Sequence, residues 1–167
     1  MVVFDASILI DFLNPKLSGD KRIKLDYLLE TLAKSKTKII IPTPVLAEFM
    51  AIANKAKEQY FQKISYSSQF RISPFDQKSA MECALMIGAA KASADKKGGS
   101  LTWAKAKFDW QIISIAKSEN ATAIYSDDND ISRIGARFNI DVIKTFDLPL
   151  PPSALQGRLE FNPEPLH

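Results

Sequence analysis

Residues 38–49, which read KIIIPTPVLAEF, place a β-branched run directly before the start of a helix. The isoleucine run predicts a strand that Pro42 ends, because proline cannot donate a hydrogen bond to a neighbouring strand. Thr43 then has the character of a helix N-cap and Pro44 that of a first helical residue, so we expect a helix through about Ala56. A strand that passes into a helix without a linker is typical of α/β folds.

The same alternation continues on both sides of this stretch. Towards the amino terminus, Val2–Phe4 is a short β-type run, and leucines between Leu25 and Leu32 recur at the spacing of one helix face. Towards the carboxyl terminus, we expect strands over 70–73, 121–125 and 141–144 and helices over 58–65, 77–92, 103–118 and 131–138. Strands separated by helices pair in parallel through right-handed crossovers. The sequence therefore predicts a small three-layer α/β/α sandwich with a short, mostly parallel central sheet.

Length and composition indicate one globular domain. The chain has 167 residues, of which 46% are hydrophobic and 25% charged, as in ordinary soluble domains. Five of the nine prolines lie in the last stretch, so we expect a domain over 1–146 and a proline-rich tail over 147–167. The amino terminus lacks the basic segment of a signal peptide, and no run of about 20 apolar residues occurs. A cytoplasmic location without membrane contact is the expectation.

Composition also excludes several chemistries. The chain contains one cysteine and one histidine, and the histidine is the last residue, His167. A Ser-His-Asp triad, a Cys-His pair, a His/Cys zinc site and an internal disulfide framework are therefore excluded. Hydrolytic chemistry must depend on carboxylates, hydroxyls and lysines. The formal net charge of +3 is compatible with a polyanionic partner.

Acidic residues follow two of the predicted strands. Asp5 comes directly after Val2–Phe4, and three aspartates follow the strand that ends at Tyr125, namely Asp127, Asp128 and Asp130. If these strands are neighbours in the sheet, both acidic sites open at the same edge. Alternatively, an aspartate after a strand is ordinary turn chemistry.

Two further acids interrupt apolar helix faces. Glu48 shares a stripe with Val45 and Phe49, and Asp109 shares another with Ile112 and Ile113. Carboxylates are seldom buried unless they are paired or bind a cation. The alternatives are a salt bridge or the edge of the stripe for Glu48, and a favourable acid near a helix start for Asp109.

A cluster of these four acidic sites would be costly without a cation. Two carboxylates about 5 Å apart repel by roughly 3 kcal/mol at an effective dielectric constant near 20. A bound metal ion relieves this repulsion. Because the ligands are all oxygens, the ions that fit are Mg²⁺ or Mn²⁺, and such sites commonly hold substrate phosphates as well.

Four segments of the chain, taken together and in this order, resemble the motifs of the PIN-domain family of metal-dependent nucleases, especially its VapC-like toxin branch. They read VFDASILI at 3–10, IPTPVLAE at 41–48, FDWQIISIA at 108–116 and AIYSDDNDI at 123–131. The resemblance extends from residue 2 to about residue 143. It implies catalytic, metal-binding roles for the acids that match the family's motifs, namely Asp5, Glu48, Asp109 and Asp128.

The resemblance also implies roles for residues around these acids. Asp130 matches an auxiliary metal ligand, and Ser7 and Ser126 match polar positions that orient ligands. Asp127 competes with Asp128 for the fourth acidic role, and the Ser-x-Asp spacing favours Asp128.

The implied activity is Mg²⁺- or Mn²⁺-dependent endoribonuclease hydrolysis of RNA phosphodiester bonds, by the toxin of a toxin–antitoxin pair. The implied partners are an RNA substrate, an antitoxin protein and a second copy of the chain in a homodimer. Two alternatives are a PIN-domain nuclease that processes RNA without an antitoxin, and a nuclease-inactive module that binds RNA or scaffolds other proteins. Basic residues around the acids are expected to contact RNA phosphates, among them Lys21, Lys24, Lys105, Arg133 and Arg137. Alternatively, they solvate helix faces.

Overall fold

The protein is seen in a computed structural model that describes residues 1–52, 57–92 and 103–156, the side chains of residues 57, 103–106, 155 and 156 excepted. Within these ranges, five strands form one parallel sheet in the order β3-β2-β1-β4-β5. The strand bounds are β1 Val2–Phe4, β2 Ile39–Pro42, β3 Phe70–Ser73, β4 Ala123–Tyr125 and β5 Val142–Ile143. The predicted parallel α/β architecture is confirmed.

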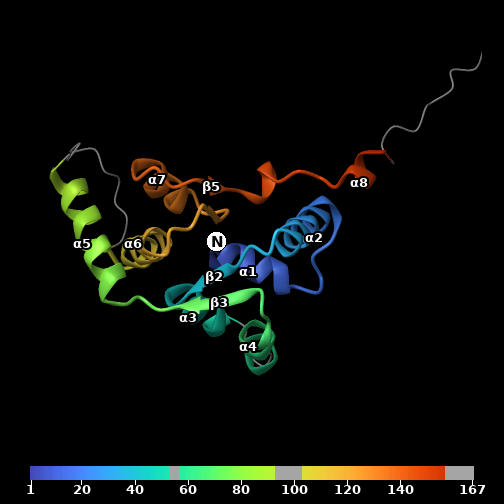
Figure 1. Cartoon of the computed structure of the whole chain (residues 1–167), viewed down its shortest axis with the longest axis horizontal. Coiled ribbons are helices and arrows are strands. Elements are labelled where there is room, and N and C mark those ends of the chain that lie inside the picture. Colours follow the sequence, from blue (N-terminus) through green and yellow to red (C-terminus); the bar gives the residue numbers. More distant parts are fainter. Residues whose placement is uncertain (53–56, 93–102, 157–167) are drawn as a thin grey trace, which may run out of the picture.

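Helices connect and cover the strands. Their bounds are α1 Ala6–Leu13, α2 Gly19–Lys34, α3 Thr43–Ile52, α4 Lys57–Tyr66, α5 Gln77–Ala92, α6 Trp103–Ser118, α7 Asn129–Arg137 and α8 Pro152–Gln156, with a 3₁₀ turn η2 at Thr145–Asp147. Figure 1 shows α5 and α6 on one side of the strands and α2 on the other, which gives the α/β/α sandwich. None of the helices in the described ranges combines the length and hydropathy that a membrane crossing requires.

The strands are buried because helices cover both faces of the sheet. Phe4 and Ile124 are fully inaccessible at the centre, and the isoleucines of β2, Ile39 to Ile41, are equally buried. Strands covered on both sides have continuous apolar sequences instead of alternating ones. This explains why the run KIII, which has no two-residue periodicity, still forms a strand.

The order of the strands creates a crevice between β1 and β4. The chain builds β1, β2 and β3 in one direction, then returns through α5 and α6 to place β4 on the other side of β1. Where the winding direction reverses in this way, ligands bind at the carboxyl ends of the strands. Phe4 lies opposite Tyr125 in the register, so Asp5 and Ser126 follow side by side.

The helix α1, Ala6–Leu13, is not among the predicted elements, because its apolar run of isoleucine and leucine has no clear helical periodicity. In the structure Asp5 is its N-cap residue, with an extended backbone. The tail over 147–167, expected to be extended, contains the short helix α8, whereas residues 157–167 lie outside the described ranges.

Candidate metal and nucleic-acid site

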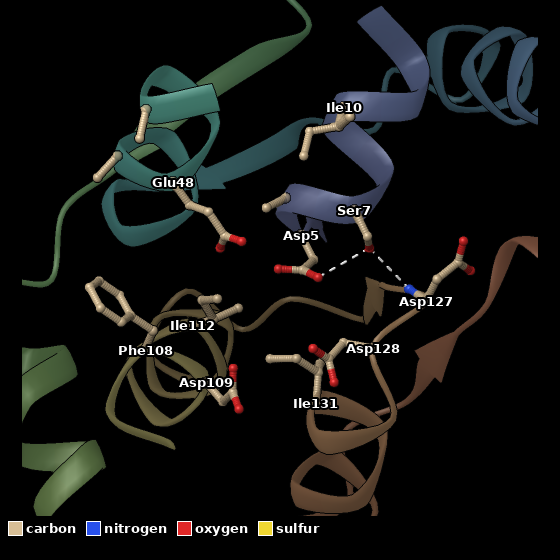
Figure 2. A pocket seen from close by; sticks show the side chains of 13 residues that line it. Asp5, Ser7, Ile10, Glu48, Phe108, Asp109, Ile112, Asp127, Asp128 and Ile131 are labelled. Carbon is tan, nitrogen blue, oxygen red and sulfur yellow. Dashed lines mark hydrogen bonds between the residues drawn. The ribbon is translucent and has the colours of Figure 1, made fainter. Parts of the chain in front are cut away.

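A pocket of about 750 Å³ opens at the carboxyl ends of β1 and β4. We call it the acid pocket, because its lining includes five acidic residues, Asp5, Glu48, Asp109, Asp127 and Asp128. The four predicted catalytic acids are all among them, and they come from the residue after β1, from α3, from α6 and from the loop before α7. Figure 2 shows their carboxylates around one shared space.

Asp5 is held in place by the two serines predicted to orient ligands. Its side chain is buried, and its Oδ2 atom accepts hydrogen bonds from the hydroxyl of Ser126 at 2.7 Å and from that of Ser7 at 3.2 Å. The hydroxyls of Ser7 and Ser126 therefore both donate to the same carboxylate oxygen of Asp5. Ser126 is itself fully buried, directly after β4. A neutral hydroxyl orients the carboxylate and leaves its negative charge uncompensated.

Asp128 is fixed by the start of α7. It is the N-cap residue of that helix, and its Oδ1 accepts the backbone N–H of Asp130 at 2.7 Å. The N–H of Asp128 donates to the hydroxyl of Ser126 at 3.1 Å, so one serine connects the Asp5 and Asp128 positions. An aspartate at an N-cap satisfies one of the free N–H groups of the first turn.

The neighbouring Asp127 has a different environment. Its carboxylate accepts the N–H of Thr145 at 2.7 Å and the hydroxyl of Thr145 at 2.9 Å, and it forms a salt bridge with Lys21 at 3.1 Å. In Figure 2 it points away from the other acids. The N–H of Asp127 donates to the hydroxyl of Ser7 at 3.1 Å, so this residue also supports the serine that contacts Asp5.

The pKa values of Asp127 and Lys21 reflect this pairing. Burial alone would raise the pKa of Asp127, but hydrogen bonds from Thr145 and Lys21 outweigh it and hold the pKa below its usual range. Burial would likewise lower the pKa of Lys21, but hydrogen bonds to Asp11 and Asp127 raise it. Both groups are charged at neutral pH, and together they tie α2 to the loop after β4.

Asp109 and Glu48 differ in burial. Asp109 is 5% exposed beside the buried Ile112 and Ile113, as its stripe predicts. Its Oδ2 is buried and accepts no hydrogen bond from the described residues, although other interactions of the residue exist. Glu48 is exposed, as expected if it lies at the edge of its apolar stripe and not within a buried face.

The face of α3 explains the exposure of Glu48. Val45 and Phe49 are buried, but Ile52, near the end of the same helix, is 58% exposed. Glu48 lies at the border of the buried face, where α3 reaches the acid pocket.

Three of the remaining predicted residues, Asp130, Arg133 and Arg137, are not in the lining of the acid pocket. Asp130 accepts a hydrogen bond from the exposed Arg133 at 3.1 Å, one turn into α7. Arg137 donates to the backbone oxygen of Ala90 in α5 at 3.0 Å. Lys105 belongs to α6, but its side chain lies outside the described part of the chain. Metal binding by Asp130 and RNA binding by the basic residues stay predictions.

The donor set of the acid pocket fits a hard divalent cation. As placed, no three acidic, histidine or cysteine side chains in the described ranges are grouped to hold a metal ion. The carboxylates instead face one space from different sides. Mg²⁺ keeps several of its waters and is commonly held by one or two carboxylates together with substrate phosphates, so a closed protein cage is not required. Oxygen-only ligands suit Mg²⁺ and Mn²⁺.

No sequence pattern predicts two features of the site. Thr145 and Lys21 hold Asp127, and apolar side chains such as Ile10, Phe108 and Ile131 line much of the acid pocket. Lys21 is predicted only as an RNA contact. Its partner Asp127 follows the distant strand β4, and a single sequence does not reveal this contact.

The chain belongs to the PIN domain family, which matches residues 2–137. This range includes all four acids that the acid pocket brings together.

The fold is similar to that of solved VapC toxins. The structure of VapBC2 from Rickettsia felis, bound to a DNA fragment from its promoter, has a TM-score of 0.61 at 24% identity and covers 86% of this chain and 98% of its own. VapC20 of Mycobacterium tuberculosis, a sarcin-ricin loop cleaving toxin, has a TM-score of 0.55 at 16% identity, with coverages of 81% and 95%. DNA-bound VapBC of Salmonella typhimurium has a TM-score of 0.56 at 15% identity, with coverages of 86% and 97%. No curated protein sequence matches the chain.

Proposed function

We propose that the chain is a Mg²⁺- or Mn²⁺-dependent endoribonuclease and the toxin of a toxin–antitoxin pair. One observation supports this most strongly: carboxylates from four separate elements, Asp5, Glu48, Asp109 and Asp128, line one pocket at the point where the sheet reverses its winding. Membership of the PIN domain family over 2–137 supports the same activity.

Each acid has a proposed task that follows from its surroundings. Asp5, Asp109 and Asp128 hold the divalent ion, and the serine hydroxyls fix the orientation of Asp5. Glu48 reaches the same space from the exposed border, where it ligates the ion or orients the attacking water. The chemistry that such an ion supplies when bound is polarisation of the phosphate, a lower pKa of a bound water and stabilisation of the leaving oxygen.

The reaction is hydrolysis of a phosphodiester bond. A water oxygen bonds to phosphorus as the bond to the 3′-oxygen breaks, the departing oxygen gains a proton, and the products carry a 5′-phosphate and a 3′-hydroxyl. No histidine base is needed. Removal of the 2′-hydroxyl beside the cut is expected to leave cleavage intact, whereas strict dependence on that hydroxyl would indicate a different mechanism.

The proposed partners follow from the resemblance and the similar structures. The structures from Rickettsia felis and Salmonella typhimurium are VapBC complexes, which supports an antitoxin partner. VapC20 is described as cleaving the sarcin-ricin loop, which supports RNA as the substrate. We further propose a homodimer, a cytoplasmic location, and a nuclease domain over 1–146 followed by the tail 147–167.

The first test is cleavage of a mixed RNA pool in the presence of Mg²⁺ or Mn²⁺. The wild type is expected to cleave, and Asp5→Asn is expected to lose at least about 100-fold in rate. Asp141→Asn is the matched control, because Asp141 is exposed at the amino end of β5, on the edge of the sheet opposite the acid pocket. Equal rates for Asp5→Asn and Asp141→Asn would remove Asp5 from catalysis.

A second test separates the toxin from a processing enzyme without an antitoxin. The product of the neighbouring upstream reading frame is expressed with the chain and tested for co-purification and for inhibition of cleavage. A small DNA-binding protein that binds and inhibits supports the toxin. Cleavage that proceeds unchanged in its presence favours RNA processing, and absence of cleavage by the wild type favours a binding or scaffold module.

A further inference from the structure

A second pocket, of about 510 Å³, adjoins the acid pocket. Asp127 lines both pockets, so they meet at the loop after β4. We call the second one the lysine pocket, since its lining contains three lysines: Lys21, Lys24 and Lys144, together with Asp20, Asp127, Thr145 and Phe146. It is built by α2 and by the segment after β5, two regions that lie far apart in the sequence.

The three lysines have different partners. Lys21 is neutralised by two carboxylates, since its Nζ lies 2.5 Å from Asp11 and 3.1 Å from Asp127. Lys24 donates to the backbone oxygen of Phe146, and Lys144 donates to the amide oxygen of Asn129 at 2.6 Å. These two acceptors are neutral, so neither hydrogen bond pairs Lys24 or Lys144 with a carboxylate, although the lining also contains Asp20, one turn before Lys24 on α2.

Phe146 adds an aromatic surface beside these charges. Its side chain is 86% exposed, and the Nζ of Lys24 lies 5.3 Å from the centre of its ring. An open aromatic face next to cations matches single-stranded nucleic acid, whose bases stack on the ring while the phosphates contact the charges. Such stacking accepts any base, because every base has a π-face.

We infer that the lysine pocket binds the RNA strand next to the cleaved phosphate, with Lys24 and Lys144 at backbone phosphates and Phe146 stacked on a base. This inference rests on the proposed function and adds the path of the substrate to it. Asp127 is the shared wall, and its pairing with Lys21 removes negative charge at the point where the strand passes between the pockets.

Part of the proposed subsite lies beyond the matched domain. Lys144, Thr145 and Phe146 lie after residue 137, where the family match ends. An acidic protein segment would also meet the lysines here. RNA fits better, because a substrate cleaved in the acid pocket must continue past its rim, and the lysine pocket shares Asp127 with the lining of the acid pocket.

The test is binding of a fluorescent oligouridine of about 12 nucleotides to the full chain in chelator, so that no cleavage occurs. Phe146→Ala is expected to weaken binding by about 5- to 100-fold, and Phe146→Trp to restore it. Lys144→Gln is expected to reduce the slope of log affinity against log salt by about 0.7. Tyr66→Ala is the matched control, because Tyr66 is an aromatic residue 85% exposed on α4. It should bind as the wild type does.

The outcomes separate the subsite from the proposed function. If Phe146→Ala binds the oligouridine as tightly as Tyr66→Ala, the inferred subsite is wrong, even where the wild type cleaves RNA. If Phe146→Ala instead weakens only the binding of a polyglutamate peptide, the surface serves an acidic protein and the inference is overturned. If Phe146→Ala weakens RNA binding but the wild type cleaves no RNA with metal, the RNA contact stands and the proposed nuclease function fails.

Discussion

Two carboxylates near the loop after β4, those of Asp5 and Asp127, have different hydrogen-bond partners. On one side, Asp5 is oriented by the hydroxyls of Ser7 and Ser126, which are neutral donors. On the other side, Asp127 is paired with the ammonium group of Lys21 and accepts two hydrogen bonds from Thr145. The two carboxylates are connected, because the N–H of Asp127 donates to Ser7.

This difference agrees with the proposed catalytic role of Asp5 and with a structural role for Asp127. A carboxylate paired with a lysine has little electrostatic reason to attract a further cation. A carboxylate fixed by hydroxyls is oriented while its charge remains, as a metal ligand requires. Asp127 and Asp128 are identical residues next to each other in sequence, and only their surroundings separate the two roles.

The largest difference between the two roles is expected when the neighbouring aspartates Asp127 and Asp128 are neutralised one at a time. Asp128→Asn is expected to lower RNA cleavage by at least about 100-fold, because it removes a proposed ligand charge. Asparagine is a good N-cap, so α7 should persist. Asp127→Asn is expected to lose much less cleavage activity than Asp128→Asn, because the carboxylate of Asp127 points away from the other acids and pairs with Lys21. The measurement is the cleavage rate of each variant at saturating metal, with circular dichroism as the folding control. A larger loss for Asp127→Asn than for Asp128→Asn would show that the two roles are assigned the wrong way round.

A smaller effect is expected from the serine that connects Asp5 and Asp128. Ser126→Ala removes a 2.7 Å hydrogen bond to Asp5 and the acceptor for the N–H of Asp128. Loss of such a supporting partner commonly lowers metal affinity or activity by about 10- to 100-fold. Ser126→Thr retains the hydroxyl and should recover activity. Ser7→Ala, whose bond is 3.2 Å long, should have the smaller effect. Equal activity of Ser126→Ala and the wild type would contradict the orienting role.

The pairing of Asp127 with Lys21 and Thr145 predicts a loss of stability for Asp127→Asn. We expect about 1–2 kcal/mol of unfolding free energy, since charged hydrogen bonds are lost but solvent screens the partly exposed Lys21. The comparison is made by urea denaturation at neutral pH, with Asp141→Asn as the control. A change no larger than that of the control would contradict the structural role.

This stability difference should depend on pH. The folded-state pKa of Asp127 is lowered, so its stabilisation is fully present above the unfolded-state pKa of about 3.9. It disappears as the pH falls through the lower folded-state value. The difference between wild type and Asp127→Asn should therefore be constant near neutral pH and close below a pH of about 4. A difference that persists in acid would show that charge is not its cause.

The smallest effect is expected on the outer surface of α7. Arg133 is exposed and pairs with Asp130, and surface ion pairs contribute at most about 1 kcal/mol. Arg133→Ala should leave stability nearly unchanged and weaken RNA binding modestly and independently of sequence, with a lower salt dependence. An unchanged salt dependence would indicate that Arg133 only solvates its helix.

Local patterns predict most elements of this fold. The run KIIIP and the Thr43-Pro44 pair predict β2 and the start of α3, and the helix expected over 77–92 is α5, whose first turn is stabilised by Asp76 as it accepts the N–H of Ser79 at 2.8 Å. The helix α1 is missed because six of its eight residues are apolar, and so short an apolar run cannot be distinguished from a strand by periodicity.

Sequence patterns also predict the four acids and the serines beside Asp5, but not the rest of their surroundings. Asp5 and Asp128 meet because β1 and β4 are neighbours, a pairing across most of the chain. For Glu48 the sequence leaves open a place within an apolar face or at its edge, and the structure shows it exposed, because the apolar stripe of α3 extends beyond the core to Ile52. The contact of Thr145 with Asp127 depends on how β5 continues, which no local motif encodes.

The proposed function requires that the acid pocket binds a divalent cation through the carboxylates that line it. Titration of Mn²⁺ into metal-free protein, followed by calorimetry with RNA present, tests it for the wild type, Asp109→Asn and Asp141→Asn. We predict that the wild type and Asp141→Asn bind Mn²⁺ equally and that Asp109→Asn binds at least about tenfold more weakly. Equal binding by Asp109→Asn, or no binding by the wild type, would contradict the claim.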